Sequence, residues 1–266
     1  MPDRCPHRGA ALSLGRVNPA RCSLVCPFHG LEFGSDGRCV HIPVEPDARI
    51  PDNFGVDSLP VTEADGFIWL WRGAPVAASE RPPVPRHPAV SGMRYGASVG
   101  EWNAHYTRCI ENVCDFSHLP FVHKTTIGLL NRDYAIRVEI EDVTGGFRAH
   151  LMKGGKRAQC LEFLYPNRWL LMLSPRMMLG LVFAPIDDDH TAVYGRTYHR
   201  LPLPEWFMNG YNRFSQYLVF REDFPIVASQ TPGDVLEARS EKLFPSDAPV
   251  IAYRRLHRAF APAESA

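Results

Sequence analysis

The chain has no long run of apolar residues and no excess of charge of either sign. None of its apolar stretches approaches the roughly twenty residues that a membrane-spanning helix requires, so no membrane span is predicted. Its 29 basic residues equal its 29 acidic residues, and this balance offers nothing that would attract nucleic acid or an anionic membrane. No internal repeat is evident. With 266 residues, 45% of them hydrophobic, the chain can bury a core in one or two domains.

Cysteine is also sparse, and its spacing is irregular. The seven cysteines are odd in number and do not form the pattern of a disulfide framework. Cys5 and Cys26 are predicted metal ligands, as described below. The other cysteines are predicted to be free thiols in a reducing compartment, the cytoplasm. These five are Cys22, Cys39, Cys109, Cys114 and Cys160. Cys22 and Cys39 flank the ligand segments and are less favoured alternatives as ligands.

Cysteine and histidine occur together in two short segments near the start of the chain. Residues 5–9 read Cys-Pro-His-Arg-Gly, and residues 26–30 read Cys-Pro-Phe-His-Gly. Two thiolates and two imidazoles are the ligands of a Rieske-type [2Fe-2S] cluster, in which histidines replace the cysteines on one iron. The predicted ligands are Cys5, His7, Cys26 and His29. Zinc accepts the same ligand types, but zinc fingers usually separate a cysteine pair from a histidine pair, whereas each segment here supplies one of each.

The two segments resemble the Rieske domains of non-haem iron oxygenases. The resemblance covers residues 3–9, Asp-Arg-Cys-Pro-His-Arg-Gly, and residues 29–33, His-Gly-Leu-Glu-Phe. Rieske domains of that family have several β-strands before the first ligand segment, whereas Met1 and Pro2 lead directly into it here. We therefore expect a domain that is incomplete at its N-terminus, through truncation or a misassigned start. A targeting peptide cannot be assessed from this sequence.

Turn residues and prolines divide the chain into three parts. We predict a mostly-β Rieske domain over residues 1–73, a proline-rich, extended linker over 74–90 and a second domain over 91–266. Apolar runs separated by turn signals predict an antiparallel sheet in the second domain. Its strands are expected at 134–140, 147–152, 160–165, 169–173, 179–184 and 191–198. Helices are expected near 103–119 and 205–230.

A second group of ligand residues lies at the end of the first predicted helix. Asp115, His118 and His123 follow the pattern D-x2-H-x4-H. Asp115 and His118 are expected on one helix face, because they are three residues apart. Pro120 is expected to end or bend the helix, so that His123 can turn back toward them. Such a histidine pair could also fill a core, but an upstream cluster implies an electron acceptor and therefore favours metal binding.

Two imidazoles and one carboxylate hold non-haem Fe(II) and leave other positions open for oxygen and substrate. The carboxylate must come from elsewhere in the chain, and the second predicted helix offers Asp223. Glu222 is adjacent and equally able to supply an oxygen, so it remains the alternative. The predicted metal ligands are therefore His118, His123 and Asp223.

These residues extend the resemblance to the catalytic subunits of Rieske oxygenases. Asn112, Asp115, His118 and His123 match the mononuclear-iron motif of that family, and residues 222–223 match its carboxylate position. Other segments look like the branches that contain pheophorbide a oxygenase and the vanillate-type demethylases of methoxy-aromatic acids. The resemblance implies an α+β fold, in which a Rieske domain is joined to a helix-grip, START-like catalytic domain whose curved antiparallel sheet surrounds a substrate cavity.

The resemblance also implies a terminal oxygenase component. An NAD(P)H-dependent reductase, alone or with a ferredoxin, would supply electrons through the cluster to Fe(II). With O2, the enzyme would hydroxylate or O-/N-dealkylate an aromatic or other cyclic organic substrate. The family forms homotrimers, in which His29 of one chain would meet Asp115 of the next, so that Asp115 bridges the two metal groups.

Two alternatives stay open at this point. One is a Rieske electron-transfer protein fused to a ligand-binding helix-grip domain without oxygenase activity, and the other is an inactive fragment. The sequence does not indicate the substrate.

Overall fold

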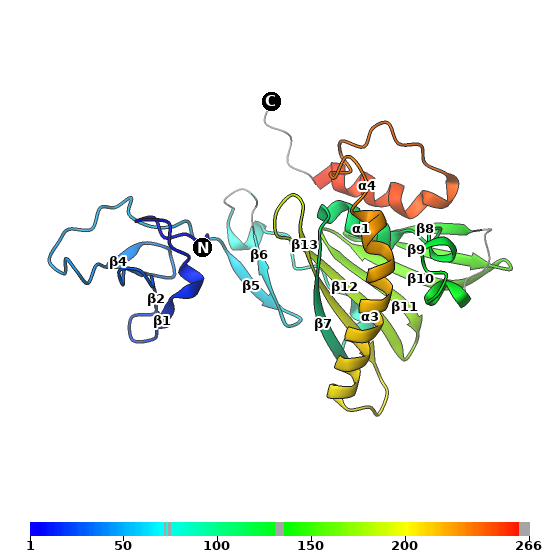
Figure 1. Cartoon of the computed structure of the whole chain (residues 1–266), viewed down its shortest axis with the longest axis horizontal. Coiled ribbons are helices and arrows are strands. Elements are labelled where there is room, and N and C mark those ends of the chain that lie inside the picture. Colours follow the sequence, from blue (N-terminus) through cyan, green and yellow to red (C-terminus); the bar gives the residue numbers. More distant parts are fainter. Residues whose placement is uncertain (72, 74–75, 131–135, 261–266) are drawn as a thin grey trace. The chain divides into compact units, whose positions relative to one another are not determined.

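The computed structural model describes residues 1–71, 73, 76–130 and 136–260. The chain divides into two compact units, Met1–Val84 and Pro85–Ala266 (Figure 1). Within the described ranges, every helix is too short or too polar to cross a lipid bilayer.

The first unit consists of short strands and turns. Its elements are η1 (Leu12–Leu14), β1 (Arg16–Asn18), β2 (Ser23–Val25), β3 (Glu32–Phe33), β4 (Cys39–His41), β5 (Val61–Ala64), β6 (Phe67–Leu70) and η2 (Ala78–Glu80). Strands β1 to β4 form an antiparallel sheet in that order, and β5 and β6 form a separate hairpin. The hairpin turns at Asp65 and Gly66, whose φ angles of 55° and 70° are those that a two-residue type I′ turn requires.

A small core in the first unit contains both cysteines of the ligand segments. Its buried members are Cys5, Leu12, Cys26, Leu31, Phe33 and Cys39. Ile42, Ile50, Phe54 and Val56 pack around them. The two ligand segments are thus anchored from the inside by apolar contacts.

The second unit is a seven-stranded antiparallel sheet with helices. Its elements are η3 (Pro88–Val90), β7 (Arg94–Trp102), α1 (Tyr106–Cys114), α2 (Leu119–Val122), η4 (Ile127–Leu130), β8 (Arg137–Val143), β9 (Gly146–Lys153), β10 (Lys156–Leu164), β11 (Arg168–Ser174), β12 (Met177–Pro185), β13 (Thr191–His199), α3 (Glu205–Val227), η5 (Pro245–Asp247) and α4 (Ala248–Phe260). The strand order is β7-β13-β12-β11-β10-β9-β8. Strands β8 to β13 neighbour one another in chain order, so short hairpins are enough to connect them. The early strand β7 lies beside the last strand, β13.

The main core of this unit lies between the sheet and three helices. Helix α1 packs against β12, α3 against β7 and β13, and α4 against β8 and β9 (Figure 1). Alternate residues of the strands point into this core, as Phe147, Ala149 and Leu151 do along β9. The helices supply Cys109, Ile110 and Tyr253, which are fully buried.

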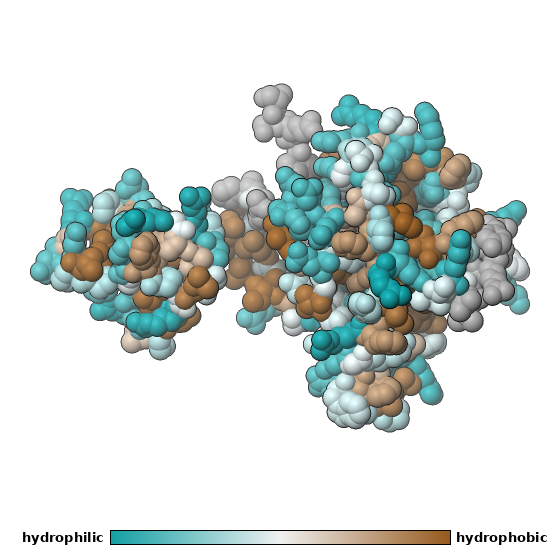
Figure 2. All heavy atoms as spheres, in the orientation of Figure 1, coloured by the Kyte–Doolittle hydropathy of each residue, from teal (hydrophilic) through white to brown (hydrophobic). Residues whose placement is uncertain are grey.

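Helix α3 buries one side and exposes aromatic side chains on another. Met208, Gln216 and Asp223 are buried, whereas Trp206 and Phe214 are exposed. Figure 2 shows hydrophobic residues gathered over this helix. A hollow of about 840 Å³ lies between β7 and α3. Its lining includes Trp102, Phe214, Tyr217, Phe220 and Phe224, but not His118, His123 or Asp223.

The α+β class and the antiparallel sheet are confirmed, and the six predicted strands correspond to β8 to β13. The first of them was placed at 134–140, of which residues 134 and 135 lie outside the described residues. The helix expected near 205–230 is α3. The linker is only partly extended, because η2 and η3 lie within its range.

The helix expected over 103–119 is wrong in its extent, because α1 ends at Cys114. Strand β7 and helix α4 were not predicted from the sequence.

Candidate metal centres

The two ligand segments of the first unit fold into equivalent loops. In the first loop the Cys5 N–H donates to the Ala10 carbonyl (2.8 Å) and the Gly9 N–H donates to the Cys5 carbonyl (2.9 Å). In the second loop the Cys26 N–H donates to the Leu31 carbonyl (2.8 Å) and the Gly30 N–H to the Cys26 carbonyl (3.1 Å). Gly9 and Gly30 have φ angles of +75° and +73°, which side chains strongly disfavour. Each loop therefore depends on its glycine.

The four side chains are arranged with sulfur inside and imidazole outside. Cys5 and Cys26 are 3% and 2% exposed, whereas His7 is exposed and His29 is half-buried. The two imidazole rings lie edge to face, with 4.8 Å between their centroids. Burial raises the pKa of the Cys5 thiol, and the nearby Cys26 thiol raises it further. Two buried thiols and two outer imidazoles on separate loops fit a [2Fe-2S] cluster, whose two irons take different ligands.

The two other cysteines near this region make contacts of their own. The Cys39 thiol donates to the carbonyl of His41 and the Cys22 thiol donates to the carbonyl of Pro19, both at 3.7 Å. Cys39 is buried in the small core and Cys22 is exposed.

In the second unit, Asp115 directly follows the last residue of α1, where the chain leaves the helix. Its backbone is extended, with φ −83° and ψ 127°. Its carboxylate accepts the backbone N–H groups of Ser117 (2.6 Å) and His118 (3.2 Å), which is the local turn that aspartate side chains favour. Asp115 and His118 therefore do not share one helix face, contrary to the prediction. They belong to the turn between α1 and α2.

Pro120 also acts differently from the prediction. It lies in the first turn of α2, where a backbone N–H has no acceptor within the helix, so proline is tolerated there. It begins a second short helix and does not end the first. His118 precedes α2 and His123 follows it, so this single turn of helix brings the two imidazoles together.

Three side chains converge between α2 and α3. The Nε2 atoms of His118 and His123 are 3.3 Å apart. Oδ1 of Asp223 lies 3.0 Å from Nε2 of His123 and 3.5 Å from Nε2 of His118. This is the one group of metal-ligating side chains with such spacing found among the described residues. His123 and Asp223 are 1% and 3% exposed, and α3 buries Asp223 on its inner side.

The donor set fits a divalent iron ion. Two imidazole nitrogens and one carboxylate are the ligands of a facial triad, which leaves other coordination positions open. Oδ1 of Asp223 is buried and accepts no hydrogen bond, although two ring nitrogens lie near it. A buried oxygen of this kind is costly unless a cation or a donor satisfies it.

The two adjacent carboxylates of α3 contact opposite nitrogens of the same ring. Glu222 Oε2 lies 2.8 Å from Nδ1 of His123, whereas Asp223 approaches Nε2. Burial lowers the pKa of His123, but the carboxylates of Asp223 and Glu222 outweigh it and the pKa is raised. Burial raises the pKa of Glu222, but hydrogen bonds from Thr125, Thr126 and His123 outweigh it and the pKa is lowered.

Asp115 lies beside this group, and its backbone N–H donates to the Asn112 carbonyl (3.3 Å). Oδ2 of Asp115 is 3.5 Å from Nδ1 of His118. Burial raises the pKa of Asp115, but interactions with His118 and Ser117 outweigh it and the pKa is lowered. The side-chain nitrogen of Asn112 is buried and makes no hydrogen bond.

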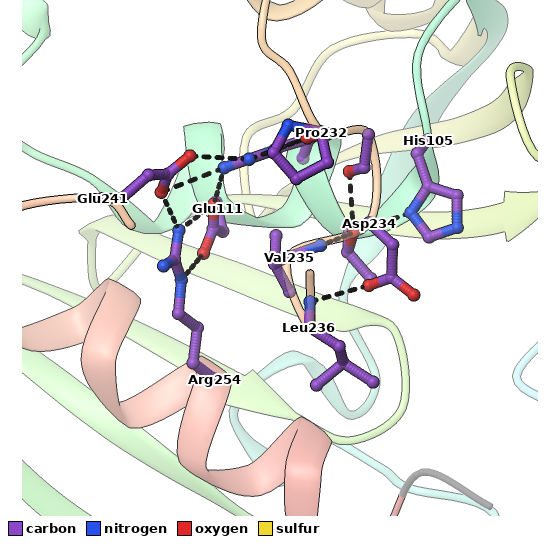
Figure 3. Close-up of polar contacts among 11 residues, drawn as sticks. His105, Glu111, Pro232, Asp234, Val235, Leu236, Glu241 and Arg254 are labelled. Carbon is purple, nitrogen blue, oxygen red and sulfur yellow. Dashed lines mark hydrogen bonds and ion pairs between the residues drawn. The ribbon is translucent and has the colours of Figure 1, made fainter. Parts of the chain in front are cut away.

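A network of buried ion pairs, which was not predicted from the sequence, connects α1, α4 and the segment after α3 (Figure 3). On α1, Arg108 pairs with Glu111 (2.9 Å) and with Glu241 (2.7 Å). Arg108 also donates two hydrogen bonds to the carbonyl of Pro232, which follows α3. Arg254 of α4 binds both Glu111 and Glu241. The network therefore ties α1 to α4 and to the segment after α3, and its only local sequence signal is the i, i+3 spacing of Arg108 and Glu111.

Comparisons with known proteins match one domain family to each of the two units. The profile of the Rieske [2Fe-2S] domain matches residues 1–60, and that of the vanillate O-demethylase oxygenase C-terminal domain matches residues 102–168. Methylxanthine N1-demethylase NdmA of Pseudomonas putida is 34% identical over 254 residues, which are 88% of this chain and 69% of NdmA. The solved structure of Pseudomonas putida CBB5 NdmA has a TM-score of 0.77 at 28% identity, covering 96% of this chain and 75% of that one.

Chlorophyllide a oxygenase of Chlamydomonas reinhardtii is 39% identical over 125 residues, which are 47% of this chain but 18% of that protein. The chain thus spans only part of the length of its curated relatives.

A Rieske domain joined to a vanillate-demethylase-type C-terminal domain defines a class of iron-dependent oxygenases. The chain belongs to the Rieske non-haem iron oxygenase family. The predicted cofactors, a [2Fe-2S] cluster and mononuclear Fe(II), are confirmed at the level of the family.

Proposed function

We propose that this chain is the terminal oxygenase component of a system that hydroxylates or O-/N-dealkylates an aromatic or other cyclic organic substrate. Electrons come from an NAD(P)H-dependent reductase, alone or with a ferredoxin, and O2 is the co-substrate. The observation that carries the proposal is the convergence of His118, His123 and Asp223 in a chain that also contains the two Cys/His loops. The printed names of the relatives include N- and O-demethylases.

The residues divide into two sets by the group that they hold. Cys5, His7, Cys26 and His29 bind the cluster, and His118, His123 and Asp223 bind the ferrous ion. When bound, the two groups supply one-electron transfer and the activation of oxygen. The outer position of His7 and His29 provides the short path to solvent along which a donor protein can deliver electrons.

Asp115 connects the two sets in this proposal. Its carboxylate lies 3.5 Å from His118 Nδ1, so it is placed to link that ring to a second histidine. By family resemblance, that histidine is His29 of a neighbouring chain in a homotrimer. Asn112, one turn earlier on α1, is proposed to support the same motif.

His118→Ala tests the proposal. The variant should keep the Rieske EPR signal of the reduced cluster and should lose all turnover with a reductase, NADH and oxygen. The substrate panel should contain methoxy-aromatic acids, N-methylated heterocycles, steroids and tetrapyrroles, with product analysis by mass spectrometry. Turnover that survives in His118→Ala would contradict the role of the ion. A parent protein that reduces its cluster but converts none of the panel would favour the electron-transfer alternative.

A further inference from the structure

Glu222 and Asp223 are neighbours in sequence, but they meet the imidazole of His123 from its two opposite nitrogens. Glu222 Oε2 is 2.8 Å from Nδ1, and Asp223 Oδ1 is 3.0 Å from Nε2. The ring is 1% exposed, so these two carboxylates and the neighbouring His118 dominate its polar surroundings. Asp223 is the proposed metal ligand, and the adjacent Glu222 has no role in that proposal.

The carboxylate of Glu222 is fixed by two hydroxyl groups. Thr125 Oγ1 donates to Oε1 and Thr126 Oγ1 donates to Oε2, each at 2.5 Å. Both oxygens of the carboxylate are therefore occupied, and Oε2 is shared between Thr126 and the ring of His123. Because the two threonines lie two and three residues after His123, the same short segment carries the ring and the groups that hold its partner.

The proton position follows once Nε2 of His123 binds the proposed metal. A metal-bound Nε2 uses its lone pair, so the one proton of the neutral ring lies on Nδ1, which donates the 2.8 Å hydrogen bond to Glu222. A neutral imidazole that is protonated at Nδ1 has its lone pair at Nε2. Nε2 is the atom that lies next to His118 and Asp223.

The other histidine is held differently. Nδ1 of His118 is 3.5 Å from Asp115 and makes no hydrogen bond, and its side chain is more exposed than that of His123. The two proposed ligand rings therefore have unequal support on their outer nitrogens.

We propose that Glu222 is a positioning residue that holds His123 with its proton on Nδ1 and its lone pair toward the metal, so that His123 is the rigid ligand and His118 the adaptable one. The proposal rests on the proposed iron site. Carboxylates that orient ligating histidines typically change metal affinity by roughly 10–100-fold when they are removed.

The test uses the full chain with Co(II) in the mononuclear site. Coordinated histidines then give strongly shifted proton NMR signals, and an Nδ1 proton that is held in a hydrogen bond exchanges slowly with water. We expect Glu222→Leu to lose the slowly exchanging signal of His123 and to bind Co(II) roughly 10–100-fold more weakly. Glu222→Gln, whose amide oxygen can still accept, should retain the signal with a smaller loss of affinity. Glu205→Leu, which removes an exposed carboxylate at the start of α3, should change neither.

The double variant Thr125→Val/Thr126→Val provides a second test that keeps Glu222 in place. It removes both hydroxyl donors, so faster solvent exchange of the His123 signal is expected, and this variant decides the matter if Glu222→Leu does not fold. Unchanged affinity and unchanged exchange in Glu222→Leu, or unchanged exchange in the double variant, would overturn the proposal. If the parent chain does not bind Co(II), it is the proposed iron site that fails, and the inference with it.

Discussion

The two candidate metal centres of this protein are built in different ways. In the first unit, each cysteine and its histidine lie within one short loop, which is closed by backbone hydrogen bonds of its own. In the second unit, the histidines flank α2, and the carboxylates that contact them come from α3, about 99 residues further along the chain. The first centre is therefore encoded locally, whereas the second exists only after the helices have packed on the sheet.

The comparison predicts that the first centre can be removed without disturbing the second. Cys26→Ala should abolish the Rieske EPR signal completely, because it removes one of the ligands, while Co(II) binding by the second unit should persist. Cys39→Ala is the matched control, since Cys39 is buried in the same core but its thiol contacts the His41 carbonyl. Loss of the signal in the control, with retention in Cys26→Ala, would assign the ligands differently.

Electron transfer between the two centres should depend strongly on Asp115, whereas the retention of iron should depend on it little. Asp115→Asn removes the charge beside His118 and keeps most of the shape. We expect single-turnover electron transfer from the reduced cluster to slow by roughly 100-fold or more, with little change in iron content. Stopped-flow absorbance and iron analysis on the same samples measure both quantities. Equal transfer rates in variant and parent would exclude Asp115 as the bridge.

The free energy of unfolding should also depend on residues that do not contact the second centre. Arg254 is buried between Glu111 and Glu241, so Arg254→Met removes one of the two arginines that neutralise these carboxylates and leaves them with Arg108 alone. The expected loss in the free energy of unfolding is about 3–5 kcal/mol, measured by urea denaturation. Arg255→Met is the control, because Arg255 is 63% exposed and pairs with exposed Asp142, and a change of about 0–1 kcal/mol is expected. Similar losses in both variants would show that burial of the network does not matter.

The smallest expected effect concerns acid. Burial raises the pKa of Glu162, but hydrogen bonds with His87 and Arg148 outweigh it, so the pKa is lowered from 4.5. A lowered carboxylate pKa contributes stability that is present above pH 4.5 and is lost as the pH falls through the folded-state pKa. Glu162→Gln should therefore show a shallower decrease in stability below pH 4.5 than the parent does. Parallel pH profiles from denaturation at several pH values would contradict this.

The contrast between the centres also explains what could be predicted from sequence. The ligands of the first centre could be named because their spacing is local. At the second centre the histidine pattern was visible and Asp223 was favoured as the carboxylate, but adjacent Glu222 stayed an alternative, since only packing shows that they face opposite ring nitrogens. The role of Asp223 as a metal ligand stays a prediction.

Two elements escaped prediction for identifiable physical reasons. Strand β7 contains Gly96, Ser98 and Gly100, which have weak strand propensity. A Cβ on Gly96 would lie 2.2 Å from the Met208 carbonyl oxygen, so position 96 requires glycine for the approach of α3. Helix α4 has a buried face that combines Val250 and Tyr253 with Arg254, and the ion pairs of Arg254 with Glu111 and Glu241 join segments whose contact the sequence does not indicate.

The central claim is that one chain holds a cluster and a separate mononuclear iron. The most direct measurement is iron and acid-labile sulfide per chain, combined with Mössbauer spectroscopy of the iron-loaded protein. The account predicts about three iron ions and about two sulfides per chain, with one iron site that Asp223→Ala removes while the cluster spectrum remains. Iron and sulfide in equal amounts, with no site that responds to Asp223→Ala, would contradict it.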